Sequence, residues 1–128
     1  MDYHILVVDD DETTRSLYLH LFNADGYRVS SASGGKGALS VISEADDIDL
    51  IISDIEMPHF SGIDFVRSLK EKKSNIPVLL ISGNRDEETL FELDNLGYKD
   101  YLHKPVRVAM LRESVKSLLE KDAKKNIT

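Results

Sequence analysis

The chain has 128 residues, of which 23 are Asp or Glu and 16 are Lys or Arg, giving a formal net charge of −7. This length suits one domain with a single hydrophobic core. The acidic balance argues against direct nucleic-acid binding, because phosphate contacts need clustered Lys and Arg. No apolar run approaches the ~20 residues that span a bilayer, and no signal-peptide pattern opens the chain. With no cysteine, disulfides and thiolate metal sites are excluded. We therefore expect a cytoplasmic protein without membrane contact.

Apolar runs alternate with helix-like segments five times along the chain. The strands are expected at 5–8, 27–32, 50–54, 77–81 and 100–103. This alternation favours a parallel sheet with helices on both faces and right-handed crossovers. We predict an α/β fold, a doubly wound five-stranded parallel sheet of the flavodoxin-like (βα)5 type, with strand order 2-1-3-4-5. The strand order rests partly on the resemblance described below. The domain is expected to span 1–120, followed by a charged C-terminal tail at 121–128.

The helices are predicted from apolar residues at helical spacing. The first begins at a cap formed by Asp11 or Thr13 and ends before Gly26. Its apolar stripe comprises Thr14, Leu17, Tyr18, Leu21 and Phe22. The second is short and centres on Leu39, Val41 and Ile42, and the third opens at Gly62 with Ile63, Phe65, Val66 and Leu69 as its buried side. The fourth runs from about Asp86 to Leu96, and the last shows on one side Val108, Leu111, Val115, Leu118 and Leu119.

Polar groups follow four of the five expected strands: Asp9 and Asp10, Asp54, Ser82, and Lys104. Taken singly, such residues are usually helix caps, turn residues or surface residues. In a parallel sheet, however, all these ends lie at the same rim, and strands one and three are neighbours at the switch point. Two carboxylates about 5 Å apart repel by roughly 3 kcal/mol at an effective dielectric near 20. One Lys cannot offset three acids, so we expect a hard divalent cation, Mg²⁺, at this rim.

Such a rim suits phosphoryl transfer. Asp54 would be the nucleophile and form an aspartyl phosphate. Mg²⁺ and Lys104 would neutralise the phosphoryl oxygens, and Ser82 or a nearby amide would donate a hydrogen bond to one of them.

Several motifs together resemble the receiver domain of two-component response regulators of the chemotaxis-regulator type. They are Val7–Val8–Asp9–Asp10–Asp11, Ile52–Ser53–Asp54–Ile55–Glu56–Met57–Pro58 with Gly62, Ile81–Ser82–Gly83, and Tyr101–Leu102–His103–Lys104–Pro105. The resemblance covers residues 5 to about 119. It implies a phosphorelay in which Asp54 accepts phosphate from a phosphohistidine on a sensor histidine kinase or histidine phosphotransfer protein.

The resemblance also implies residue roles. Asp10, Asp54 and the backbone carbonyl of Glu56 would ligate Mg²⁺, with Asp9 acting through water. Ser82 and Tyr101 match the family's switch pair, which remodels the face of the fourth helix, fifth strand and fifth helix for an unknown protein target. The protein would be a monomer or a phosphorylation-dependent dimer. It would not be an enzyme beyond self-phosphorylation and self-dephosphorylation.

Some residues depart from the family's commonest pattern or were assigned no site role. Gly83 stands where Ala is frequent, and Glu56 and Asn84 occupy variable positions beside the acceptor. The four histidines, His4, His20, His59 and His103, show no metal-site spacing and are interpreted as solvent or packing residues. The glycines at 34–37 lack the full phosphate-loop pattern.

Two other function classes fit parts of the sequence. Aspartate-nucleophile phosphohydrolases have an Asp-x-Asp motif after a strand, and Asp9 and Asp11 fit this motif. Such enzymes, however, are usually longer and carry a cap for substrate. A phosphorylation-independent module that retains receiver residues is opposed by the intact acid pair, Ser82 and Lys104.

Overall fold

The computed structural model describes residues 2–58, 60–83 and 87–127. His59, Asn84 and Asp86, named above, lie outside the described residues. In chain order the elements are β1 (His4–Val8), α1 (Glu12–Ala24), β2 (Arg28–Ala32), α2 (Gly35–Glu44), β3 (Leu50–Asp54), α3 (Gly62–Glu71), β4 (Val78–Ser82), α4 (Glu87–Asn95), β5 (Tyr101–His103) and α5 (Val108–Ile127).

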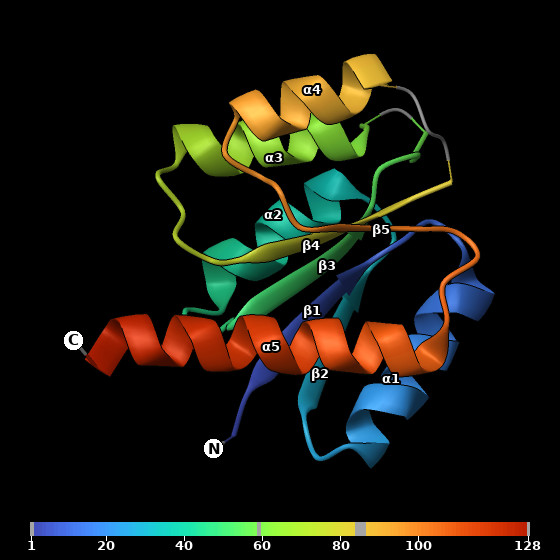
Figure 1. Cartoon of the computed structure of the whole chain (residues 1–128), viewed down its shortest axis with the longest axis vertical. Coiled ribbons are helices and arrows are strands. Elements are labelled where there is room, and N and C mark those ends of the chain that lie inside the picture. Colours follow the sequence, from blue (N-terminus) through green and yellow to red (C-terminus); the bar gives the residue numbers. More distant parts are fainter. Residues whose placement is uncertain (1, 59, 84–86, 128) are drawn as a thin grey trace.

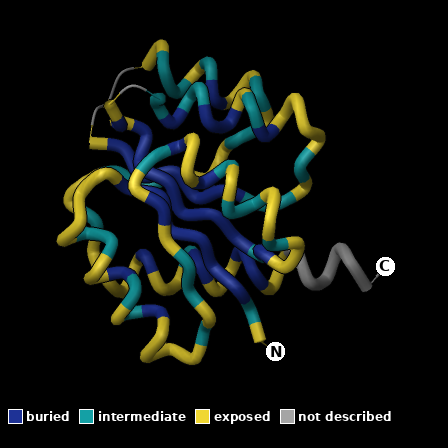
Figure 2. The backbone as a smooth tube through the Cα atoms, turned by 180° about the vertical axis from the view of Figure 1, so that it is seen from behind, coloured by how far each residue is buried: buried dark blue, intermediate teal, exposed yellow. Residues whose placement is uncertain are grey.

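The strands form one parallel sheet in the order β2-β1-β3-β4-β5. This confirms the predicted fold class and strand order. Helices α1 and α5 cover one face of the sheet, and α2, α3 and α4 cover the other (Figure 1). The three central strands, β1, β3 and β4, are buried along their whole length (Figure 2). The sequence reflects this, because strands covered on both faces are continuously apolar rather than alternating.

Each face of the sheet has its own hydrophobic core. On the α2–α4 side, the core includes Leu6, Ile51 and Leu80 together with Phe65 and Leu93. On the α1–α5 side, a second set of strand residues meets the buried residues of those two helices: Ile5, Val7, Leu50, Ile52, Leu79, Ile81, Tyr18, Phe22, Leu111, Val115, Leu118 and Leu119. Alternate residues of each central strand thus anchor opposite helix layers and fix the strand ends in place.

Helix α1 follows the expected pattern with one exception. Asp11 is its N-cap and accepts hydrogen bonds from the backbone N–H of Thr14 at 3.2 Å and from its hydroxyl at 2.6 Å, which decides between the two expected caps. Leu17 belongs to the predicted apolar stripe, but it is 54% exposed. The buried face centres on Tyr18 and Phe22, and at 3.6 residues per turn Leu17 lies roughly 120° away from that centre.

Helix α5 departs from expectation at its start. Val108, on the predicted apolar side of this helix, is 44% exposed. It is the first residue of α5. The helix continues to Ile127, and the division of the chain into 1–120 and a tail at 121–128 stays a prediction. Among the described helices, none is both long and apolar enough to cross a membrane.

Candidate functional site

Three carboxylates meet at the carboxyl end of the sheet. Asp9 and Asp10 directly follow β1, and Asp54 is the last residue of the neighbouring β3. One ligand oxygen from each of the three lies within 4.8 Å of the others. Asp9 and Asp54 are almost completely buried, at 5% and 4% exposure, whereas Asp10 faces solvent. The predicted proximity of these acids is therefore confirmed.

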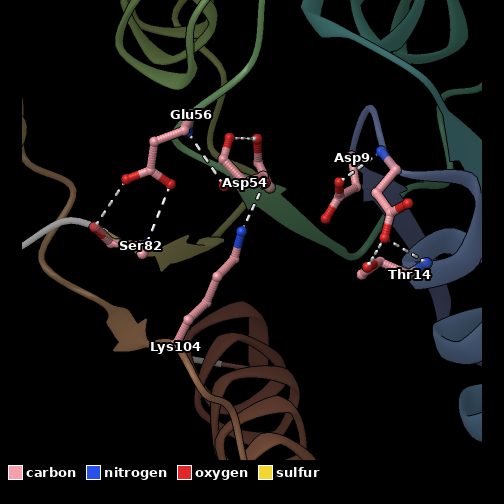
Figure 3. Close-up of polar contacts among 9 residues, drawn as sticks. Asp9, Thr14, Asp54, Glu56, Ser82 and Lys104 are labelled. Atoms are coloured by element: carbon pink, nitrogen blue, oxygen red, sulfur yellow. Dashed lines mark hydrogen bonds and ion pairs between the residues drawn. The ribbon is translucent and has the colours of Figure 1, made fainter.

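Lys104 reaches this cluster from the far side of β4. Its Nζ lies 3.0 Å from Asp54 Oδ2 and forms both a hydrogen bond and an ion pair with it. The residue directly follows β5, and its extended side chain spans the distance back to β3 (Figure 3). The Lys104–Pro105 peptide bond is cis. The sequence-predicted pairing of Lys104 with the acids is present.

The pKa values of the site report mainly how deeply its carboxylates are buried. Burial raises the pKa of Asp54 to about 6, although the hydrogen bond from Lys104 opposes this; Glu56 and Asp9 raise it further. Burial also raises the pKa of Asp9, against the hydrogen bond from the Asp11 backbone N–H at 2.9 Å. Burial works to lower the pKa of Lys104, but its hydrogen bond to Asp54 and the surrounding carboxylates outweigh that effect and raise it. The interaction with Lys104 thus does not offset the cost of burying Asp54.

The donor set fits a hard divalent cation. The group offers only carboxylate oxygens, together with solvent access through the exposed Asp10. Oxygen ligands with room for water suit Mg²⁺, whereas softer metals prefer thiolate or imidazole nitrogen. The pocket could therefore hold a metal ion of this class.

The turn after Asp54 depends on a close backbone approach. A Cβ atom on Gly62 would lie 2.6 Å from Ile55 Cα and 2.9 Å from the Asp54 carbonyl oxygen. The Gly62 N–H donates to the Ile55 carbonyl at 2.8 Å, and Ser61 caps α3 through a capping box with Asp64. Since only glycine leaves space at this contact, the residue type at position 62 sets how closely α3 starts beside the acid.

Glu56 makes contacts that the sequence analysis did not foresee. Its backbone N–H donates to Asp54 Oδ1 at 3.1 Å. Its carboxylate accepts hydrogen bonds from the Ser82 hydroxyl at 3.4 Å and from the Gly83 N–H at 3.1 Å (Figure 3). These carboxylate contacts follow from the register of β3 and β4. Asp54 pairs with Ile81, and this places Glu56 opposite Gly83 two residues further on.

The second member of the expected switch pair lies outside the pocket. Ser82 is buried at the end of β4, but Tyr101 is 40% exposed at the edge of the sheet. The Tyr101 ring packs edge-on against His103, with ring centroids 5.4 Å apart. The buried Nδ1 of His103 has no hydrogen-bond partner within the described part of the chain. The structure therefore presents Tyr101 in an outward position.

Comparison with known proteins assigns the family. The family model "Response regulator receiver domain" matches residues 5–116. The chain belongs to the response regulator receiver domain family. It is thus a signalling domain of two-component systems, as its motifs indicated. The response regulator SaeR of Staphylococcus aureus (strain USA300) is 34% identical over 117 residues, which cover 91% of this chain and 50% of that protein. The chain therefore spans about half the length of the curated relatives it matches.

Solved receiver structures share the whole architecture. A response regulator receiver domain protein from Clostridium thermocellum is 29% identical, with a TM-score of 0.87, over 98% of this chain and 99% of that one. The Vibrio cholerae chemotaxis protein CheY4 is 28% identical, with a TM-score of 0.85, over 92% of this chain and 99% of that one. A CheY-like receiver domain protein from Methanospirillum hungatei JF-1 shares the fold with a TM-score of 0.91 at 24% identity.

Proposed function

We propose that Asp54 accepts a phosphoryl group from a phosphohistidine of a sensor histidine kinase or histidine phosphotransfer protein, in a Mg²⁺-dependent reaction. The observation that carries the proposal is the position of the Asp54 carboxylate. It is buried next to two other acids, yet one oxygen is held by Lys104 Nζ and the other by the Glu56 N–H. A carboxylate fixed in this way has a defined orientation toward an incoming phosphorus atom.

In the transfer step, a carboxylate oxygen of Asp54 attacks phosphorus and forms the new O–P bond. The P–N bond to the donor imidazole breaks, and its electron pair stays on the ring nitrogen. Lys104 stabilises charge on the phosphoryl oxygens, since its ammonium already lies at the acceptor carboxylate. Ser82 or the neighbouring Gly83 N–H would donate to a further oxygen.

Mg²⁺ would be held by Asp10, Asp54 and the backbone carbonyl of Glu56, with Asp9 acting through water, and would supply positive charge to the transferring group. The support for this assignment is the oxygen-only donor set and the raised pKa values of Asp9 and Asp54.

We further propose that the α4–β5–α5 face carries the signal to a protein target. Exposed apolar residues occur on all three elements: Phe91, Tyr101, Val108 and Met110. Ser82 and Tyr101 would couple this face to the phosphorylated site, with Tyr101 leaving its outward position. The buried Ser82 hydroxyl would turn toward the new anion, and the Tyr101 side chain would move between two positions. A local change in charge would thus shift an element that has two states.

Phosphoryl uptake tests the proposal. Incubation with acetyl phosphate and Mg²⁺ should add one phosphoryl group per chain, detected by intact-mass spectrometry. The Asp54→Asn variant should gain none, and removal of Mg²⁺ with a chelator should abolish uptake by the wild type. Asp47→Asn, at the opposite end of the sheet, is the matched control and should react normally. Equal uptake by the Asp54→Asn variant would remove Asp54 from the acceptor role.

A further inference from the structure

Two hydrogen-bond donors at the end of β4 are already directed at an anion. The Ser82 hydroxyl and the Gly83 N–H converge on the two carboxylate oxygens of Glu56, at 3.4 and 3.1 Å. Figure 3 shows the Glu56 carboxylate facing Ser82, beside Asp54 and the end of Lys104. The donors are adjacent in sequence, and each takes a different oxygen, so the arrangement is bidentate.

A carboxylate edge and a phosphoryl edge place similar demands on such donors. Each presents two anionic oxygens, and hydroxyl and amide groups bind both through charge-assisted hydrogen bonds. Lys104 and these two donors surround the space next to Asp54 that a phosphoryl group on that residue would enter. The same two donors cannot form full hydrogen bonds to the Glu56 carboxylate and to a phosphoryl group at the same time. The two anions would also repel each other.

We propose that the Glu56 side chain is an internal competitor of the phosphoryl group. It holds the Ser82 hydroxyl and the Gly83 N–H while Asp54 is unmodified, and it gives them up when Asp54 is phosphorylated. This inference rests on the proposed role of Asp54 as phosphoacceptor. Glu56 is thereby a positioning residue that sets how readily the pocket accepts phosphate.

The local structure allows this exchange. Glu56 is exposed, so its carboxylate can turn into solvent without disturbing the core. Its backbone contact to Asp54 is separate from the carboxylate and remains available after the side chain leaves. Gly83 is not required for the exchange, because an added Cβ would meet Lys104 Cδ at 3.4 Å and Glu56 Oε2 at 3.8 Å, both ordinary contacts.

The test uses beryllium fluoride, a phosphoryl mimic, with Mg²⁺ and the full chain, measured by isothermal titration calorimetry. Glu56→Ala removes the competing carboxylate, and Glu56→Gln keeps its shape but not its charge. Fluoride-complex affinity should rise roughly three- to tenfold in Glu56→Ala, since charge-assisted bonds at a solvent-facing side chain are of modest strength. The affinity of Glu56→Gln for beryllium fluoride should lie between those of Glu56→Ala and the wild type.

Further measurements separate competition by Glu56 from a general change in charge or in stability. Glu12→Gln removes one acid near the same rim and should leave fluoride-complex affinity unchanged. Affinity for Mg²⁺ alone should be equal or weaker in Glu56→Ala, because a nearby negative charge is lost; a general loosening of the pocket would not move the two affinities apart. By NMR, the Gly83 amide proton should shift upfield in Glu56→Ala, since it loses a carboxylate acceptor.

The outcomes are distinct. Tighter fluoride-complex binding by the Glu56 variants supports the competitor role. Equal binding by wild type and both variants would overturn this inference and leave the phosphoacceptor proposal intact. If neither the wild type nor the variants bound the fluoride complex, the phosphoacceptor proposal and this inference would both fall.

Discussion

Acidic residues cluster at both ends of the sheet, but their interaction partners differ. At the amino end, Arg28 pairs with Asp2 at 3.0 Å and with Asp47 at 2.8 Å. His4, nearly buried, places its two ring nitrogens against Asp47 at 3.1 Å and the Ser30 hydroxyl at 2.7 Å. At the carboxyl end, Lys104 pairs with Asp54 of the acid cluster at 3.0 Å.

The pKa values of the acids shift in opposite directions at the two ends of the sheet. The hydrogen bond from Arg28 lowers the pKa of Asp47, and that same bond raises the pKa of Arg28. Burial instead raises the pKa values of Asp9 and Asp54. Acids at the amino end are therefore matched by their partners and hold the structure together. Those at the carboxyl end are buried at a cost that the ion pair with Lys104 does not offset, and a site of this kind suits metal binding and phosphoryl chemistry.

Gly62→Ala should produce the largest loss of stability. The added methyl would meet the backbone of Ile55 and the carbonyl of Asp54, neither of which can move without displacing the acid. We expect the free energy of unfolding to fall by about 3 kcal/mol, measured by urea denaturation. Gly34→Ala is the matched control, because nothing lies within 4 Å of its added methyl; an equal loss there would show that the close approach at Gly62 is unimportant.

Asp54→Asn should stabilise the metal-free protein at neutral pH by about 2 kcal/mol. The pKa of Asp54 is raised from its ordinary 3.8 to about 6. The folded state therefore binds that proton more tightly than the unfolded chain does, and the resulting stability is present below about pH 4 and lost as pH rises through about 6. The gain is less than the full linkage value, because the variant also loses the ion pair with Lys104.

The measurement is the free energy of unfolding between pH 4 and 7 in the presence of a chelator. The wild type should lose stability with rising pH, and the Asp54→Asn profile should be flatter. Asp47→Asn makes the same chemical change at the other end and should destabilise the protein, since the lowered pKa of Asp47 marks a stabilised carboxylate. Stabilisation by both variants would contradict the contrast between the two ends.

Ser30→Ala should have a smaller effect. It removes the hydroxyl that lies 2.7 Å from His4 Nε2 and leaves a nearly buried ring nitrogen without that partner. Loss of one such hydrogen bond costs about 1 kcal/mol, again measured by urea denaturation. Phosphoryl uptake should be unchanged, because Ser30 lies in the middle of β2 and its hydroxyl contacts His4 at the amino end of β1; impaired uptake would show that the two ends are coupled.

The sequence predicted the fold and the acid pocket because both follow from strand ends. Buried parallel strands read as continuous apolar runs, and their last residues meet at one rim whatever the side-chain details. Asp9, Asp10, Asp54 and Lys104 are placed by this topology alone. Their proximity therefore needed no knowledge of rotamers.

What the sequence did not predict depends on register and on side-chain direction. The Glu56 carboxylate meets Gly83 because Asp54 pairs with Ile81, and this register is not visible in residue types. Leu17 has helical spacing but lies off the buried face. His4, interpreted as a solvent or packing residue, is instead hydrogen-bonded through both ring nitrogens. Such contacts are set by rotations of a single helix or side chain.

The central claim is that unmatched negative charge at the carboxyl end of the sheet is relieved by Mg²⁺. Its most direct test is the change in unfolding free energy on adding Mg²⁺ to the wild type, Asp10→Asn, Asp54→Asn and Asp47→Asn. At ten times the dissociation constant, the wild type and Asp47→Asn should each gain about 1.4 kcal/mol, and the other two variants should lose most of that gain. An equal gain in all four proteins would place the ion elsewhere and contradict the account.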